Sequence, residues 1–366
     1  MIDTLRVGGR ERLAVELANL MDPAEFEVSI CATREGGPMA AVARRHVPVV
    51  VLGRRATWDP AGLARFGRLV RERGVDVLHS HGSGPARLAG LCRASRFAPA
   101  RHLMHDHTGD RGGDGDPLLR LAARAGVDAV IGVSEPNCRW AETALRLPPG
   151  RVHRLPHGVD VDRFRKPPPI HRAELAPADG RLLVAMVAGF SPAKDHPTLL
   201  RALSAARHRD RLHVLLVGPR FDSHAGYHDR CLALVDELGL GGQVTWLGPR
   251  TDVPAVLAAV DAGVLTSRYE SGPLALAEYL AAGLPYVVTA TGEVTEAVRG
   301  TETGFVVPPG DAVQVAAALD RLVDLPPEGR ALLGARGRAL AEKRFDLRGA
   351  AGPLAAIYRA LAGGGG

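Results

Sequence analysis

Residues 267–285, SRYESGPLALAEYLAAGLP, combine a turn with an apolar-periodic helix. They follow residues 261–266, DAGVLT, a short apolar run typical of a buried strand. Pro273 suits the first turn of the helix, because its missing N–H would have had no partner there. Gly283 and Pro285 predict where the helix ends. The stretch therefore predicts a strand, a turn and a helix in direct succession.

The turn of this stretch has the chemistry of an anion site. Helix starts leave backbone N–H groups without intrahelical partners, and the small residues Ser271 and Gly272 allow an anion to approach them closely. Glu270 precedes the turn and Glu278 lies inside the helix, and carboxylates accept hydrogen bonds from hydroxyl groups while repelling oxyanions. Phosphate and hydroxyl groups together indicate a nucleotide-sugar. The alternative is an ordinary strand, turn and helix whose glutamates face water.

Length and composition indicate a globular protein of two domains. The 366 residues exceed the usual size of one domain. Hydrophobic residues make up 46% and charged residues 23%, a balance unlike that of fibrous or disordered proteins. The four cysteines stand far apart without a CxxC motif, so neither a zinc site nor a disulfide framework is indicated. Because no apolar run approaches the ~20 residues that span a bilayer and no signal sequence is present, we predict a cytoplasmic protein.

The net charge of +6 bears on the class of partner. A basic surface attracts phosphates, anionic lipids or nucleic acid. Aromatic residues make up only 4%, which leaves no stacking platform, so we expect no nucleic-acid partner. Several arginines within residues 44–73 support a secondary hypothesis of peripheral contact with the inner face of a membrane. The alternative is a solvated basic surface without a partner.

The chain opens on a glycine turn, Gly8-Gly9, before a predicted helix at residues 10–21. In an α/β unit such a turn follows a buried strand. Only Met1 and Ile2 form an apolar run before this turn, so we expect a truncated first strand.

Strands and helices then alternate through both halves of the chain. Strands are predicted at residues 26–32, 48–52, 75–79, 102–105, 129–133, 182–188, 213–217, 244–247, 264–266, 286–289 and 305–307. Helices are predicted at residues 61–73, 85–92, 118–125, 135–145, 198–206, 228–238, 253–259, 313–325 and 330–344. Near-continuous apolar strands joined by helices predict parallel, doubly wound sheets. The predicted fold class is α/β, with two Rossmann-like domains facing each other across a cleft at the carboxyl ends of their strands.

A charged, proline-rich run at residues 160–169, DVDRFRKPPP, separates the two halves. We therefore predict an N-terminal Rossmann-like domain at residues 1–165 and a C-terminal Rossmann-like domain at residues 170–345. Residues 346–366 contain a last helix, which we expect to pack back on the first domain, and a glycine tail.

Two pairs of histidines follow predicted strands of the first half, His79 with His81 and His105 with His107. Residues i and i+2 of a strand face the same side, so each pair presents two imidazoles together. A metal with Asp106 or Asp110 as an oxygen ligand is one interpretation, although the spacing matches no known ligand motif. The alternatives are histidines bonded to loop backbone and an imidazole that contacts a sugar hydroxyl.

Two cations follow strands of the second half. Lys194 lies in the loop AGFSPAKDH, where an ammonium is able to neutralise a diphosphate, and a solvated loop lysine is the alternative. Arg250 in LGPRTDVP is a candidate for contact with phosphate, and an exposed arginine is the alternative. Asp252 has the position of a helix N-cap.

These segments together resemble a GT-B glycosyltransferase of the family 4 type over nearly the whole chain. Glu270 and Glu278 match the Glu-x7-Glu pattern of that family, AGFSPAKDH its lysine loop, and GFVVPPGD a late strand and turn. In the first half, DTLRVGGRERL is similar to its glycine-rich loop, DVLHSHG to its fourth-strand loop, and RLPHGVDVDRF to the segment that enters the linker. The order of several motifs makes the resemblance specific.

The resemblance implies roles for residues of the second half. Glu278 is expected to bind the ribose of the donor, and Lys194 to stabilise the departing diphosphate. Glu270 is expected to hold the donor sugar and phosphate together with the turn made by Ser271, Gly272, Pro273 and Leu274. Arg250 remains a further candidate for the donor phosphate.

In the first half, the resemblance implies that Gly8 and Gly9 border the donor and that one histidine lies beside its sugar. We assign this role to His107, with His105 as the competing choice. The resemblance further implies retention of anomeric configuration, no metal or other cofactor, and closure of the two domains around the donor. The expected partners are a UDP-, GDP- or ADP-sugar and a hydroxyl acceptor.

The chain departs from the family pattern at three positions. Gly189 stands where an arginine is usual, so half of a cationic pair is absent, and Ala290 and Glu293 replace a more usual aspartate and glycine. The leading hypothesis is a retaining transferase that moves a hexose-like unit to a glycan, glycolipid or natural product. The alternatives are a nucleotide-sugar 2-epimerase of the same fold and a non-catalytic protein that binds nucleotide-sugar or a protein partner.

Overall fold

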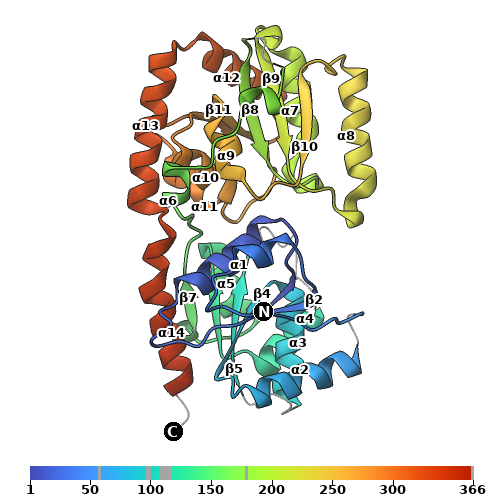
Figure 1. Cartoon of the computed structure of the whole chain (residues 1–366), viewed down its shortest axis with the longest axis vertical. Coiled ribbons are helices and arrows are strands. Elements are labelled where there is room, and N and C mark those ends of the chain that lie inside the picture. The colour runs from blue at the N-terminus through green and yellow to red at the C-terminus, as the bar shows by residue number, and fades with distance from the viewer. Residues whose placement is uncertain (57–58, 96–99, 108–116, 178–179, 364–366) are drawn as a thin grey trace. The chain divides into compact units, whose positions relative to one another are not determined.

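The computed structural model of the chain describes residues 1–56, 59–95, 100–107, 117–177 and 180–363 (Figure 1). Two compact units make up the chain. Unit 1 consists of Met1–Pro156 with Leu347–Gly366, and unit 2 of His157–Asp346. No helix in the described ranges is long and apolar enough to cross a membrane.

Unit 1 is an α/β structure whose strands all pair in parallel. Its strands are β1 (Ile2–Thr4), β2 (Ile30–Glu35), β3 (Val49–Val51), β4 (Val77–His81), β5 (Arg101–Asp106), β6 (Ala129–Gly132) and β7 (Val152–Arg154). Its helices are α1 (Gly9–Leu20), α2 (Pro60–Glu72), α3 (Ser83–Ala94), α4 (Pro117–Gly126), α5 (Glu135–Ala144) and α14 (Ala351–Gly363). Hydrophobic clusters of buried residues contribute to its core, among them those around Phe66, Val15 and Met104.

The strands of unit 1 form two hydrogen-bonded sheets, in the orders β1-β2-β3 and β4-β5-β6-β7, where the sequence pattern predicted a single sheet. The edges of the two sheets are joined by a bond of 2.9 Å from the His81 N–H to the Met1 carbonyl. The short first strand does form, as β1, and it pairs with β2. Residues 26–29, expected to begin a strand, precede β2 instead.

Gly90 lies where α3 packs closely on α4. A Cβ at Gly90 would lie 2.5 Å from the carbonyl oxygen of Ala122, so only glycine lets these two helices approach as they do.

Unit 2 is a six-stranded parallel sheet in the order β10-β9-β8-β11-β12-β13. Its strands are β8 (Leu182–Val187), β9 (Leu212–Val217), β10 (Val244–Gly248), β11 (Ala262–Leu265), β12 (Tyr286–Thr289) and β13 (Phe305–Val307). Its helices are α6 (Asp162–Arg165), α7 (His196–Ala205), α8 (Ala225–Glu237), α9 (Val253–Ala258), α10 (Leu274–Ala282), α11 (Gly292–Val298), α12 (Ala312–Asp324) and α13 (Pro327–Arg344). Helix α7 packs with α8 and α12, and α10 packs with α9 and α13, so two groups of helices cover the sheet (Figure 1). The predicted pair of Rossmann-like domains is confirmed.

The strand order of unit 2 reverses direction between β8 and β11. From β8 the chain adds β9 and β10 on one side, and from β11 it adds β12 and β13 on the other. In open α/β sheets, ligands bind at the carboxyl ends of the strands at such a switch point. The loops that follow β8 and β11 are therefore the first place to look for a site.

Helix α10 is anchored across this switch point by Tyr279. Its fully buried ring carries a hydroxyl that accepts the Val187 N–H at 3.0 Å and lies 3.1 Å from the Ala185 carbonyl and 3.0 Å from that of Val264. A Cβ at Gly263 would stand 2.4 Å from the same ring. Bonds to both β8 and β11 thus set the position of α10 relative to the two strands.

The ends of α10 follow the sequence pattern with one correction. Pro273 immediately precedes the helix, in extended backbone, and is not part of its first turn. Gly283 ends the helix in the left-handed conformation, with φ of 70°.

The last helix, α14, belongs to unit 1. The Tyr358 hydroxyl lies 2.7 Å from His79 Nδ1, and the Arg359 guanidinium pairs with Glu25 through both of its carboxylate oxygens. These contacts hold α14 against β4 and the segment that follows α1.

Candidate functional site

The loops after β8 and β11 are joined by hydrogen bonds. Thr266 Oγ1 donates to the Asp195 carbonyl at 3.0 Å, and the Arg268 N–H donates to the Ala193 carbonyl at 2.8 Å. We call the resulting group the switch-point site, and it comprises Lys194, Asp195, Ser267, Arg268, Glu270 and residues 271–274. These residues come from the same edge of one sheet, as the alternation of strands and helices predicted.

Lys194 and Glu270 form an ion pair in this site. The carboxylate is also held by Ser267, whose Oγ donates to Glu270 Oε1 at 2.7 Å. The side chain of Lys194 is 28% exposed and that of Glu270 10% exposed. Two residues that the sequence predicted for separate roles thus neutralise each other.

Asp195 and Arg268 form a second ion pair beside the first, and sequence reasoning missed it. Arg268 Nε donates to Asp195 Oδ2 at 2.7 Å, and Thr198 Oγ1 donates to the same oxygen at 2.7 Å. Asp195 is buried and has a left-handed backbone with φ of 48°, which directs the chain from the lysine loop into α7. Contact with this carboxylate keeps Arg268 next to the Lys194 loop.

The turn before α10 is supported from the segment that opens unit 2. His157 Nδ1 lies 2.7 Å from the Gly272 carbonyl, so the nitrogen donates and the imidazole carries its proton there. Burial lowers the pKa of His157, which keeps the ring neutral. A Cβ at Gly272 would lie 3.2 Å from the same nitrogen, so a larger residue would crowd this contact. The sequence pointed to His157 only through its place in the segment RLPHGVD, which resembles the family's entry into the linker.

The turn itself presents Ser271, Gly272 and Pro273 before the first helical residue, Leu274. The N–H groups at the start of α10 therefore face a small-residue turn, as predicted. Glu278 is 7% exposed and lies one residue before the anchored Tyr279, so its carboxylate belongs to the buried part of α10.

Gly189, where the resemblance expects an arginine, is covered by an aromatic ring. A Cβ at Gly189 would lie 2.5 Å from Cε2 of Phe221, whose side chain is 39% exposed. The glycine and the phenylalanine are sterically matched, and the space that a larger side chain would need is already filled.

Arg250 is paired with a carboxylate of its own loop, and its contact with phosphate stays a prediction. Its guanidinium forms a bidentate pair with Asp252, with Nε to Oδ1 at 2.8 Å and Nη2 to Oδ2 at 2.6 Å. The prediction that Asp252 caps α9 is correct in position only, because its side chain makes no cap bond. This pairing also lowers the pKa of Asp252 and leaves Arg250 locally neutralised.

In unit 1, the glycine turn lies at the start of α1. Gly8 precedes the helix and Gly9 is its first residue. A Cβ at Gly8 would meet Glu11 Oε2 at 2.3 Å, so the missing side chain makes room for this carboxylate.

The two histidine pairs lie next to each other because β4 pairs with β5 in a register that sets His81 opposite His105. His79 Nε2 lies 3.2 Å from His105 Nδ1, and His81 Nδ1 lies 3.0 Å from His107 Nε2. Burial and the neighbouring imidazoles lower the pKa of both His79 and His81 well below 6.5, so these rings are neutral at pH 7.

The histidine cluster has the donors for a transition metal. One nitrogen each from His79, His81 and His105 lies within 4.8 Å of the others, and neutral imidazole is a common ligand of such ions. Asp106 is buried and accepts a bond of 2.7 Å from Asn137 Nδ2. Asp110, the other oxygen ligand considered from the sequence, lies outside the described residues. The expectation that no metal is needed stays a prediction.

Of the two histidines considered for contact with a sugar, His105 is 1% exposed within β5, whereas His107 is partly exposed just after that strand. The assignment of the sugar contact to His107 stays a prediction.

Comparison with known proteins identifies relatives of both halves. The family described as Glycosyltransferase Family 4 matches residues 7–163, and the family described as Glycosyl transferases group 1 matches residues 169–339. D-inositol 3-phosphate glycosyltransferases of Mycobacterium bovis and Mycobacterium tuberculosis are 31% identical to this chain over 322 residues, which cover 83% of it. The chain spans 65% of the length of these relatives.

Solved structures share the fold. The Anabaena protein HepE in complex with UDP-glucose has a TM-score of 0.81 at 21% identity, covering 97% of each chain. Sucrose-phosphate synthase from Thermosynechococcus elongatus has a TM-score of 0.79 at 22% identity, covering 98% of this chain and 94% of that one. The two adjacent family matches, from residue 7 to residue 339, and this shared fold show that the chain belongs to the GT-B glycosyltransferases of group 1.

Proposed function

We propose that the chain is a retaining glycosyltransferase that moves a hexose-like unit from a nucleotide-diphosphate sugar to a hydroxyl acceptor. The observation that carries this proposal is the convergence of Lys194, Glu270 and the start of α10 at the switch point of unit 2. This group offers positive charge and N–H donors for a diphosphate, beside carboxylate for hydroxyl groups.

The diphosphate is proposed to bind at the start of α10. The helix N-terminus carries a partial positive charge, and Lys194 adds a full one as it leaves Glu270 for the phosphate oxygens. Since residue 189 is a glycine, that position supplies no cation, and leaving-group stabilisation is proposed to depend on Lys194 and the start of α10. In this proposal the reaction needs no metal ion.

The two glutamates are proposed to orient the donor. Glu278 accepts hydrogen bonds from the ribose, and Glu270, released by Lys194, accepts them from hydroxyl groups of the sugar. Unit 1 is proposed to bind the acceptor, with His107 as the imidazole beside the sugar. HepE, which has the same fold, has been solved in complex with UDP and with UDP-glucose, which supports a UDP-sugar as the first donor to test.

The acceptor is proposed to be a hydroxyl group of a phosphorylated polyol. The support is the 31% identity to proteins named D-inositol 3-phosphate glycosyltransferase. In unit 1, the side chain of Arg10 is 45% exposed and its Nη2 pairs with Glu11 Oε1 at 3.0 Å. Its Nη1 lies 2.8 Å from where a Cβ on Gly82 would be, and Gly82 directly follows β4. A guanidinium at the carboxyl end of a strand suits a phosphate on the acceptor.

One assay separates this proposal from its alternatives. The chain is incubated with UDP-, GDP- and ADP-sugars, and nucleotide release is followed with and without inositol 3-phosphate, free inositol and extracts of glycans or lipids. Release that needs an acceptor supports transfer, and NMR of the product anomer tests retention. Sugar interconversion without an acceptor would indicate an epimerase, and binding without turnover a non-catalytic protein.

Two substitutions test the site itself. Glu278→Ala and Lys194→Ala should each weaken use of the donor, while Glu302→Ala, a change at an exposed glutamate paired with Arg336, should not. If both site variants turn over donor at the rate of the unmodified chain, the assignment of the switch-point site is wrong.

A further inference from the structure

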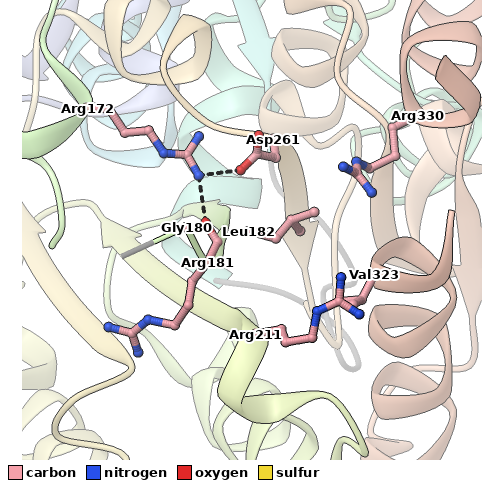
Figure 2. Close-up of a pocket in the computed structure, with 8 residues that line it drawn as sticks. All are labelled: Arg172, Gly180, Arg181, Leu182, Arg211, Asp261, Val323 and Arg330. Carbon is pink, nitrogen blue, oxygen red and sulfur yellow. Dashed lines mark hydrogen bonds and ion pairs between the residues drawn. The ribbon is translucent and has the colours of Figure 1, made fainter. Parts of the chain in front are cut away.

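A pocket of 280 Å³ opens in unit 2 between the sheet and the helices α12 and α13 (Figure 2). Its lining consists of Arg172, Gly180, Arg181, Leu182, Arg211, Asp261, Val323 and Arg330. Of the described residues that line it, four are arginines and one is an aspartate, so their formal charges give an excess of three positive charges.

This pocket lies at the amino ends of the strands. Arg181 immediately precedes β8, Arg211 immediately precedes β9, and Asp261 immediately precedes β11. In a parallel sheet the amino ends lie at the edge opposite the carboxyl ends, where Lys194 and Glu270 are found. The pocket is therefore separate from the switch-point site, and the function proposed above does not use it.

Asp261 contributes a carboxylate to the described lining, and this carboxylate already accepts hydrogen bonds from the protein. Asp261 Oδ2 accepts Arg172 Nη2 at 2.6 Å and the Leu183 N–H at 2.7 Å. Arg172 Nη2 also donates to the Arg181 carbonyl at 2.8 Å, as drawn in Figure 2. Asp261 thus balances Arg172.

Arg211 and Arg330 carry this surplus charge. Within the ranges that the structure describes, neither forms an ion pair with a carboxylate. Arg330 is held in place by bonds from Nη1 to the carbonyls of Leu322 and Leu325 at the end of α12. Figure 2 shows both guanidiniums on the same side of the pocket, next to Val323. Arg181, in contrast, turns away and donates to the Gly242 carbonyl at 2.6 Å.

We propose that this arginine pocket binds a phosphate dianion, carried by inorganic phosphate or by a small phosphorylated metabolite. Two guanidiniums on one side of a concave surface repel each other, and a dianion between them removes the repulsion and accepts several charge-assisted hydrogen bonds. Because Arg330 is already held by hydrogen bonds to α12, binding of the anion costs side-chain conformational entropy mainly at Arg211. The volume lies just below the roughly 300–1,000 Å³ typical of sites for drug-sized ligands, which favours a compact phosphate ester over a nucleotide-sugar.

The test is titration calorimetry of the whole chain with inorganic phosphate, at an ionic strength held constant with sodium chloride. Parallel titrations with glucose 6-phosphate distinguish a metabolite from free phosphate. Since the switch-point site also attracts phosphate, every titration is repeated on Lys194→Ala. Arg211→Gln removes the exposed guanidinium of the pocket, and Arg201→Gln, an equal loss of charge at an exposed position of α7, is the matched control.

We expect phosphate or its ester to bind to the unmodified chain, to Lys194→Ala and to Arg201→Gln alike. Arg211→Gln should bind about tenfold more weakly or worse, the effect of one lost charge-assisted hydrogen bond. The proposal is overturned if neither anion binds, if Lys194→Ala abolishes binding, or if Arg211→Gln retains full affinity. Matching thermal unfolding curves for the two arginine variants show that a lost affinity does not reflect a lost fold.

Discussion

Replacing Glu270 by glutamine should strengthen the binding of UDP while it lowers turnover. In the unliganded protein the Glu270 carboxylate holds Lys194, so a diphosphate both competes for the ammonium and meets a negative charge beside it. Glutamine keeps the shape of the side chain and an oxygen that accepts from Ser267 Oγ. It removes only the charge.

The size of the effect follows from the separation and exposure of the charges. A carboxylate about 6 Å from a phosphate oxygen, at an effective dielectric constant of about 20, opposes binding by about 3 kcal/mol. Because Lys194 is 28% exposed, we discount this value for solvent screening to about 1–2 kcal/mol. The dissociation constant of UDP should therefore fall by about 5- to 30-fold.

The assay is calorimetry with UDP on Glu270→Gln and on a matched control, Glu296→Gln. Glu296 is an exposed glutamate of α11 paired with Arg299, so its substitution should leave UDP affinity unchanged. The gain at Glu270 should shrink as salt is raised, since it is electrostatic. Turnover should fall, because the carboxylate that orients the sugar is lost. Weaker or unchanged UDP binding in a folded Glu270→Gln variant would refute this account of the ion pair.

Four further outcomes are expected. Lys194→Ala should lower kcat about 100- to 1,000-fold, as measured by nucleotide release, because the leaving diphosphate loses its cation. An unchanged kcat would mean that another group stabilises the diphosphate. Gly189→Arg should cost about 1–3 kcal/mol of unfolding free energy in urea, because its side chain meets Phe221, and Phe221→Ala in the same chain should remove most of that cost. EDTA should leave transfer unchanged, and activity lost to EDTA and restored by Zn²⁺ would instead assign a metal to the histidine cluster. Below about pH 6.5, His79 and His81 become protonated in the unfolded chain but stay neutral in the folded chain. The unfolding free energy of unit 1 should therefore drop by about 2 kcal/mol from pH 6.5 to 5.5. An unfolding free energy in urea that does not change between these pH values would contradict this.

Several features could be predicted because short windows of sequence encode them. The apolar run before the turn, the helix after it and the glycine that ends the helix each follow from residues within a few positions of one another. Gly283 adopts φ of 70° because a helix end needs that backbone and glycine tolerates it. Alternating strands and helices likewise predicted parallel sheets, and with them the edge at which Lys194 and Glu270 lie.

The partners of individual side chains could not be predicted in the same way. Whether Arg250 faces a ligand or Asp252 depends on a rotamer choice that the spacing leaves open. That Phe221 fills the space beside Gly189 depends on how a loop 32 positions later folds back. Sequence reasoning assigned these side chains by type, whereas their contacts are set by packing.

The sequence by itself determined the strand, turn and helix of residues 267–285 and the two glutamates that belong to them, since turn chemistry and helical periodicity are local. Tertiary structure alone decided that Glu270 holds Lys194, 76 positions away, and that His81 stands opposite His105. It also brought together the arginines that line the pocket at the opposite edge of the sheet. The physical reason is that strand register and helix packing are collective properties of the whole core, so the neighbours they create leave no local pattern in the sequence.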